Sequence, residues 1–172
     1  MFFSAIIVHM DAISLTRLQD VVPALAQKIQ TMATMLEQEG IEIRVVQALR
    51  SWSQQDALYA QGRTAPGSIV TNCPGGYSYH NLGLAVDTVP SQFAPGQPYN
   101  PDWNAQHPSW IRMEQIGQSL GLDSGATWRS FPDAPHFQLT GPYPEGAPTD
   151  EVRQIFKDGG MIAVWQAAGL TT

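Results

Sequence analysis

Two short segments carry the side chains best suited to chemistry. Within residues 78–87, His80 stands at the end of a glycine- and serine-rich loop, and Asp87 lies on the strand predicted to follow. In the second segment Asp133 precedes His136 by three residues, with prolines on both sides of Asp133. Because proline is excluded from helix interiors, we expect His136 to begin an extended strand, and Asp133 not to be its helical neighbour.

Two histidines and one carboxylate form a familiar donor set for a metal. Three protein ligands leave the fourth position of a tetrahedral Zn²⁺ for water, which is the catalytic form of such a site. Zinc lowers the pKa of that water from 15.7 to roughly 7, so hydroxide is available at neutral pH. We therefore predict one Zn²⁺ per chain, held by His80, Asp87 and His136. Asp133 is the candidate carboxylate for moving the proton from the water to a leaving amine.

The composition narrows the function classes. The 172 residues suit one domain, and 43% of them are hydrophobic. A net charge of −6 argues against a nucleic-acid partner, because binding to phosphates needs clustered Lys and Arg. No apolar run approaches the roughly 20 residues that span a bilayer, so we predict no membrane partner. Cys73 is the only cysteine, which excludes a thiolate zinc site and an internal disulfide.

Hydrophobic periodicity predicts a mixture of helices and short strands. Apolar residues spaced three or four apart over 18–36 indicate an amphipathic helix. A helix tolerates proline in its first turn, so we expect Pro23 to lie there and Asp20 to be the N-cap. Residues 41–45 alternate as in a half-buried strand. Ser53 and Asp56 resemble a capping box that opens a short helix.

The second half of the chain continues this pattern. We expect strands at 85–89 and 136–139, and a helix at 110–120 whose inward residues are Ile111, Ile116 and Leu120. The result is an α+β domain with a short antiparallel sheet flanked by helices and with the zinc site at the sheet.

Three regions are expected along the chain. Residues 1–10 form an N-terminal tail or first strand, and they carry no recognisable export signal; Met1 and Met10 are both possible starts. Residues 11–140 form the catalytic domain. Residues 141–172 form a helical extension of two short helices packed back on the main body, with Thr149 as an N-cap.

The motif Ser-x-His-x-x-Gly-x-Ala-x-Asp at 78–87, followed by Asp-x-x-His at 133–136, resembles a known family of zinc peptidases. The family includes phage L-alanyl-D-glutamate endolysins and the vancomycin-resistance D,D-peptidases. The resemblance covers roughly residues 15–140, and it includes Arg50, Ser51 and Gln55, which are similar to the family's Arg-Ser-x-x-x-Gln stretch.

This resemblance implies roles for individual residues. His80, Asp87 and His136 would bind zinc, Asp133 would be the acid/base residue, and Arg50 would contact the substrate and stabilise the oxyanion. Predicted substrate-binding residues are Arg50, Ser78, Gln55 and Trp128. The D,D-peptidase branch generally carries Glu where this chain has Asp133, so the aspartate resembles the endolysin branch.

The expected activity is hydrolysis of the amide between L-Ala and D-Glu in the stem peptides of bacterial peptidoglycan, by a monomer. As an endolysin, the chain would stay in the host cytoplasm until release and then act on the cell wall. Two alternatives remain: a D,D- or L,D-carboxypeptidase that trims the stem peptide, and a non-catalytic zinc domain that binds wall fragments.

Overall fold

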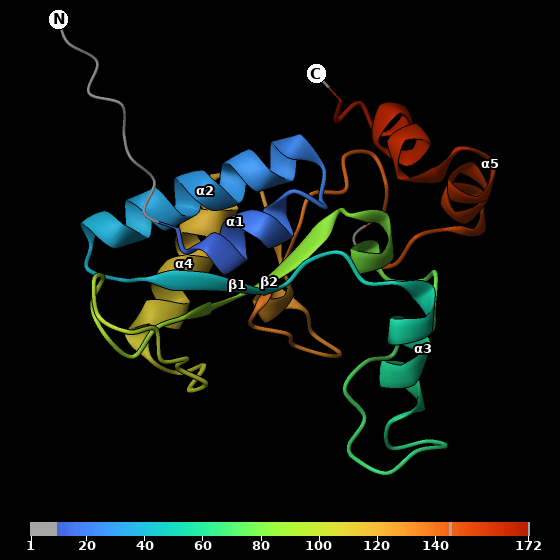
Figure 1. The fold of residues 1–172 in the computed structure, drawn as a ribbon. Helices are drawn as coiled ribbons and strands as arrows, with labels where there is room; N and C mark the ends of the chain where they lie inside the picture. The colour runs from blue at the N-terminus through green and yellow to red at the C-terminus, as the bar shows by residue number, and fades with distance from the viewer. Residues whose placement is uncertain (1–9, 145, 172) are drawn as a thin grey trace, which may run out of the picture.

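The computed structural model describes residues 10–144 and 146–171 as a small α+β domain (Figure 1). Four strands form an antiparallel sheet in the order β1-β2-β4-β3. Helix α1 lies along β1, and α2 packs against α4. The elements are α1 (Ala12–Leu18), α2 (Pro23–Gln38), β1 (Ile43–Gln47), α3 (Trp52–Ala60), the 3₁₀ turn η1 (Tyr79–Leu82), β2 (Ala85–Pro90), α4 (Pro108–Ser119), β3 (Asp123–Ser124), the 3₁₀ turn η2 (Gly125–Thr127), β4 (His136–Gln138) and α5 (Asp150–Ala167).

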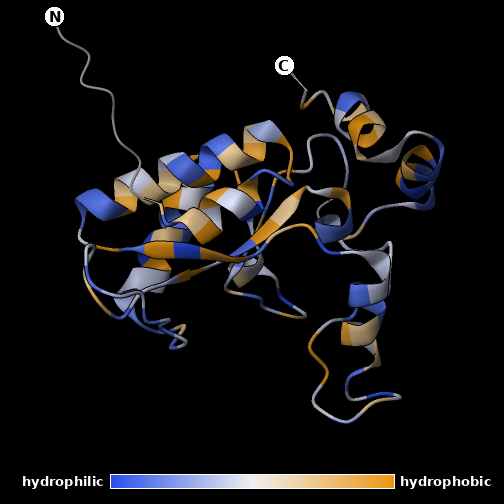
Figure 2. Cartoon of the chain, viewed as in Figure 1, coloured by the Kyte–Doolittle hydropathy of each residue, from blue (hydrophilic) through white to orange (hydrophobic). Residues whose placement is uncertain are grey.

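The core lies between the helices and the sheet. The inner face of α2 is fully buried, and Figure 2 shows orange, hydrophobic segments on β1 and β2. Phe137 of β4 is also fully buried and packs so closely on Gly117 of α4 that a methyl group there would lie 2.3 Å from the phenylalanine ring. This packing fixes the position of β4, the strand that carries His136.

The predicted helix over 18–36 is divided in two. Leu18 ends α1, and α2 begins at Pro23, which lies in the first turn as predicted and occupies its first position. The expected cap at Asp20 is wrong, because the residue before Pro23 is Val22, which makes no side-chain capping bond. Proline at this position has no N–H to satisfy and a backbone already suited to the helix, so the start does not depend on a polar cap.

The capping box of α3 also begins earlier than predicted. Ser51, not Ser53, accepts a hydrogen bond from the backbone N–H of Gln54, and the Gln54 side chain returns to the Ser51 N–H. The prediction at Ser53 and Asp56 was wrong because a glutamine at the third helical position serves as well as an acid. The shift puts Arg50 directly before the N-cap of the helix.

Helix α4 lies in the segment where a helix was predicted, but the face that it buries differs from the predicted one. Ile111 was expected inside and is 49% exposed, whereas Trp110 and Met113 are buried. The helix starts at Pro108, and the indole N–H of Trp110 donates to the carbonyl of Asp102 at 3.0 Å. The bond satisfies the indole N–H of the buried Trp110, while Ile111, the next residue, lies on the exposed side of the helix.

The chain ends in α5, which is interrupted where Gly160 leaves the helical conformation with φ 69° and ψ −167°. Two helical pieces result, and Thr149 caps the first, as predicted. The indole of Trp165 donates to the carbonyl of Leu82 in η1 at 2.7 Å. Trp52 of α3 stacks on Phe156 of α5 at 5.6 Å, so α3 and α5 lie together at one end of the molecule (Figure 1).

Residues 1–9 lie outside the described residues, and so does most of the predicted N-terminal tail or strand. Among the helices described, none combines the length and the apolar character needed to cross a bilayer.

Candidate metal centre

The sheet register brings two of the predicted ligands together. Asp87 of β2 and His136 of β4 are direct partners in the antiparallel pairing. Side chains at opposite positions of such a pair point to the same face, a few ångströms apart. Asp87 and His136 are therefore neighbours in space because of backbone hydrogen bonding, although they are far apart in the chain.

The third ligand comes from η1, which directly precedes β2. Ser78 caps this turn by accepting from the His80 N–H at 3.3 Å, and the Asn81 side chain completes a capping box. Gly83 then adopts a left-handed conformation with φ 64°, which lets the chain turn sharply into β2. The turn directs His80 back over the strand that follows it.

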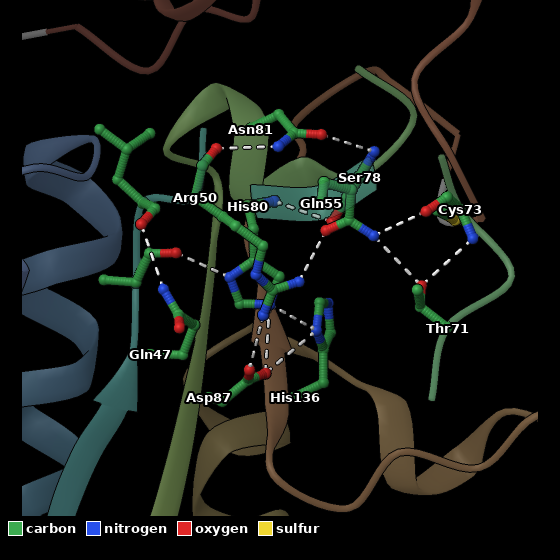
Figure 3. A network of polar contacts seen from close by, with 12 residues as sticks. Gln47, Arg50, Gln55, Thr71, Cys73, Ser78, His80, Asn81, Asp87 and His136 are labelled. Carbon is green, nitrogen blue, oxygen red and sulfur yellow. Dashed lines mark hydrogen bonds and ion pairs between the residues drawn. The ribbon is translucent and has the colours of Figure 1, made fainter. Parts of the chain in front are cut away.

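The three side chains converge on one point (Figure 3). His80 Nε2 lies 3.2 Å from Asp87 Oδ1 and 3.2 Å from His136 Nδ1. His136 Nδ1 lies 3.4 Å from Asp87 Oδ1. Both imidazoles are buried, with 3% and 5% of their surface exposed. Among the His, Cys, Asp and Glu side chains of the described residues, these three form the group that could hold a metal ion.

Each imidazole is oriented by a hydrogen bond on its outer nitrogen. His80 Nδ1 lies 2.8 Å from the carbonyl oxygen of Ala48, which can only accept, so this nitrogen carries the hydrogen. His136 Nε2 lies 2.9 Å from Oε1 of Gln138. In the neutral rings the lone pairs of His80 Nε2 and His136 Nδ1 then face Asp87, as metal ligands require. The donor set therefore fits a metal ion.

The charges of the cluster suit the binding of a cation. Burial would raise the pKa of Asp87, but the adjacent His80 and His136 lower it well below its usual range, so the carboxylate is ionised. Burial would lower the pKa of His136, yet its contacts with Asp87 raise it above the usual value. The site thus carries an anionic oxygen that attracts positive charge, whether a proton or a metal ion.

Asp133 lies beside the cluster, held by the backbone of η2. Its N–H donates to the carbonyl of Gly125 at 2.9 Å, and its own carbonyl accepts from the His136 N–H at 3.1 Å. A methyl group on Gly125 would lie 2.5 Å from the Asp133 carbonyl oxygen, so only glycine permits this approach. Burial and the nearby Asp87 raise the pKa of Asp133, although the histidines and Arg50 oppose them. A raised pKa suits a carboxyl that takes up and releases protons.

Arg50 contacts the cluster through Asp87. Its Nη2 lies 3.4 Å from Asp87 Oδ2, and its Nη1 donates to Gln55 Oε1 at 2.7 Å. The Arg50 Nε atom is buried and has no hydrogen-bond partner among the described residues. Gln55 is fully buried, and it also donates to the Cys73 carbonyl at 2.7 Å and to the Thr71 hydroxyl at 3.2 Å.

These side chains line one cavity of about 600 Å³, a size typical of ligand pockets. The predicted residues on its wall are Arg50, Ser78, His80, Asp87, Trp128, Asp133 and His136. The Trp128 ring lies 4.8 Å from the His136 ring. Gln55 is not among the lining residues; it lies behind Arg50 and holds it in place.

Several lining residues escaped the sequence reasoning. The loop after α3 contributes Val70, Thr71 and Asn72, and the segment before Asp133 contributes Arg129, Ser130 and Phe131. Gln138 was also missed, although its place two residues after His136 on a strand puts both side chains on one face. That spacing could have indicated it.

Comparison with known proteins agrees with this architecture. Residues 19–122, more than half of the chain, match the family described as VanY, D-alanyl-D-alanine carboxypeptidase. This chain belongs to the VanY family. The match includes Arg50, His80 and Asp87, and it ends before Asp133 and His136, which the fold brings to the same point.

A curated relative and a solved structure extend the match. The chain is 33% identical over 124 residues to the peptidoglycan L-alanyl-D-glutamate endopeptidase CwlK of Bacillus subtilis (strain 168), covering 70% of this chain and 74% of that protein. The crystal structure of the Serratia marcescens L-Ala D-Glu endopeptidase ChiX matches with a TM-score of 0.53 and 23% identity, covering 88% of this chain and 92% of that one. The second likeness confirms the α+β fold.

Proposed function

We propose that this protein is a zinc metallo-endopeptidase that hydrolyses the L-Ala–D-Glu amide of peptidoglycan stem peptides. The observation that carries the proposal is the convergence of His80, Asp87 and His136 with Asp133 in a single cavity. The bond is assigned from the relative CwlK, whose name states that activity.

The spacing of the ligand atoms supports zinc as the metal. Two ligands at 2.0–2.1 Å from a tetrahedral Zn²⁺ lie about 3.3 Å from one another. The three separations in the cluster are 3.2, 3.2 and 3.4 Å. Two imidazoles among the ligands also favour zinc over Mg²⁺ and Ca²⁺, which prefer oxygen donors alone. When bound, Zn²⁺ supplies Lewis acidity and an activated water.

The protein side chains supply the remaining steps. The Asp133 carboxylate accepts a proton from the attacking water and delivers it to the nitrogen of the departing D-Glu side of the amide as that bond breaks. Arg50, fixed by Gln55 and Asp87, places its guanidinium beside the carbonyl oxygen on which negative charge develops. Trp128 and Ser78, on the cavity wall, contact the peptide around the scissile bond.

A carboxypeptidase acting on the end of the stem peptide is the second candidate, and the description of the matched family favours it. The two activities leave different products. Digestion of defined muropeptides followed by mass spectrometry yields new L-Ala carboxyl ends for the endopeptidase and free D-Ala for the carboxypeptidase. Release of free D-Ala without new L-Ala ends would contradict our proposal.

The digestion is run with the full chain, and again with the variant Asp133→Asn. Loss of cleavage in this variant with Zn²⁺ binding intact would separate a peptidase from a domain that only binds wall fragments. We further propose that the protein acts as an endolysin-type monomer, held in the cytoplasm until it gains access to the wall. Size-exclusion chromatography with light scattering tests the monomer.

A further inference from the structure

A line of polar side chains runs from His136 away from the metal ligands to a carboxylate on the edge strand. Gln138 and Asp123 are direct partners across the β4–β3 pairing, and Gln138 follows His136 by two residues on β4. All three side chains therefore point to one face of the sheet. On the other neighbour, β2, the partner of Gln138 is Ala85, whose small side chain leaves room for the amide.

The contacts along this line are short, and the one that reaches His136 is buried. Gln138 Nε2 donates to Asp123 Oδ2 at 2.6 Å, and Gln138 Oε1 lies 2.9 Å from His136 Nε2. Gln138 has 1% of its surface exposed and His136 has 5%. Hydrogen bonds in such surroundings are strong, and a wrongly oriented donor or acceptor is costly.

The direction of each hydrogen bond follows from Asp123. An ionised carboxylate only accepts, so the Gln138 amide must turn its NH₂ group toward Asp123. The amide oxygen then faces His136 and can only accept, so His136 Nε2 must carry the hydrogen. The lone pair of the neutral ring is left on Nδ1, the atom that faces His80 and Asp87.

We infer that Asp123 and Gln138 are positioning residues that select the metal-binding tautomer of His136. This inference rests on the metal site of the proposed function. It gives Asp123 and Gln138 a role in metal binding in addition to their part in the packing of the sheet. Outer groups that orient a histidine ligand typically contribute 10–100-fold to metal affinity or activity.

The test measures Zn²⁺ affinity directly, by competition with a chromophoric chelator in the absence of substrate. Gln138→Leu keeps the approximate volume but removes the acceptor, and we expect Zn²⁺ binding about 10–100-fold weaker than in the unmodified chain. In Asp123→Asn, residue 123 no longer requires the NH₂ group of Gln138 to face it, so we expect weaker binding by a smaller factor. Gln118→Leu, an exposed glutamine on the outer side of α4, is the matched control and should bind Zn²⁺ normally.

A double variant separates the tautomer role from a merely structural one. In Asp123→Asn with Gln138→Glu, the new carboxylate can only accept, so it receives the His136 hydrogen and the amide hydrogen of the new asparagine. The order of donors and acceptors along the line is restored with different atoms. We expect this double variant to bind Zn²⁺ more tightly than Asp123→Asn alone, and to recover the visible absorption of the Co²⁺-loaded protein.

Each outcome decides a separate point. Thermal unfolding of the metal-free variants by circular dichroism establishes that the chains compared are folded. Unchanged Zn²⁺ affinity in Gln138→Leu, or a double variant no tighter than Asp123→Asn, would overturn the inference while the metal site stands. If the unmodified chain itself binds no Zn²⁺, the proposed function fails instead.

Discussion

Asp87 and His136 lie opposite each other in the pairing of β2 with β4, and their ligand atoms are 3.4 Å apart. The metal site is thus built on the hydrogen-bond ladder of the sheet. A slip of one residue in this register would turn His136 to the other face. The buried Phe137, which packs on Gly117 from the side of the sheet opposite the site, opposes such a slip. Core packing and metal ligation therefore depend on the same alignment.

Removal of the metal should abolish peptidoglycan cleavage. We expect no new L-Ala ends after dialysis against a chelator, and recovery when stoichiometric Zn²⁺ is returned, since the activated water is lost with the ion. Mg²⁺ should not restore activity, because it binds imidazole poorly. Undiminished cleavage by chelated protein that contains no metal by elemental analysis would refute the metallopeptidase proposal.

Asp133→Asn should lower kcat by about 10²–10⁴-fold, the usual contribution of general acid–base catalysis. The amide has nearly the same shape but cannot accept the proton. Because Asp133 is outside the ligand group, Zn²⁺ affinity should change little. Steady-state kinetics on a muropeptide, together with a Zn²⁺ titration, measure the two effects separately. Loss of Zn²⁺ binding in the variant would contradict the role of proton carrier and require a different role for Asp133.

Gly125→Ala should disturb the site through the backbone. The added methyl group would lie 2.5 Å from the Asp133 carbonyl oxygen and 2.9 Å from His136 Cβ, so both residues must move. We expect weaker Zn²⁺ binding and reduced activity. The control is Gly146→Ala, where a methyl group meets nothing within 4 Å. Equal Zn²⁺ affinity in the two variants would show that the close approach at Gly125 is unimportant.

Gln55→Leu should loosen Arg50. This glutamine is fully buried and satisfies three groups at once, on Arg50, Thr71 and Cys73. Leaving such partners unpaired costs roughly 1–3 kcal/mol each when they stay buried. We expect a lower unfolding midpoint in urea and a reduced kcat. Gln118→Leu, at an exposed glutamine of α4, controls for the loss of an amide; equal kcat in the two variants would show that Gln55 does not position Arg50.

Stability at acidic pH should depend in part on Asp11, the N-cap of α1. Burial raises the pKa of Asp11, but hydrogen bonds from the Ser14 N–H and from Arg44 together hold it below its usual 3.8. The folded state thus favours the ionised form, and this contribution is present above pH 3.8 and is lost as the pH falls through the lowered value. Asp11→Ala should cost about 0.5–2 kcal/mol at pH 7. Urea unfolding at pH 7 and below pH 3 should show the difference shrinking; a constant difference would contradict it.

The sequence by itself determined the chemistry of the site. The residue types and short spacings at His80, Asp87, Asp133 and His136 indicated a metal and a proton acceptor, because ligand preference depends on side-chain identity. Local signals also placed the central strands, the helix after Pro23 and the cap at Thr149, since caps and periodicity act over a few residues.

Only the tertiary structure decided how these parts meet. Asp123 lies on a strand of two residues, too short for any periodic signal, yet its pairing with Gln138 connects it to His136. Gln55 was predicted to contact substrate, and the fold places it behind Arg50 instead of on the cavity wall. Ile111 faces outward because the opposite side of α4, with Met113 and Ile116, packs against α2 and β2. Each of these outcomes depends on contacts between segments far apart in the chain, which local pattern does not encode.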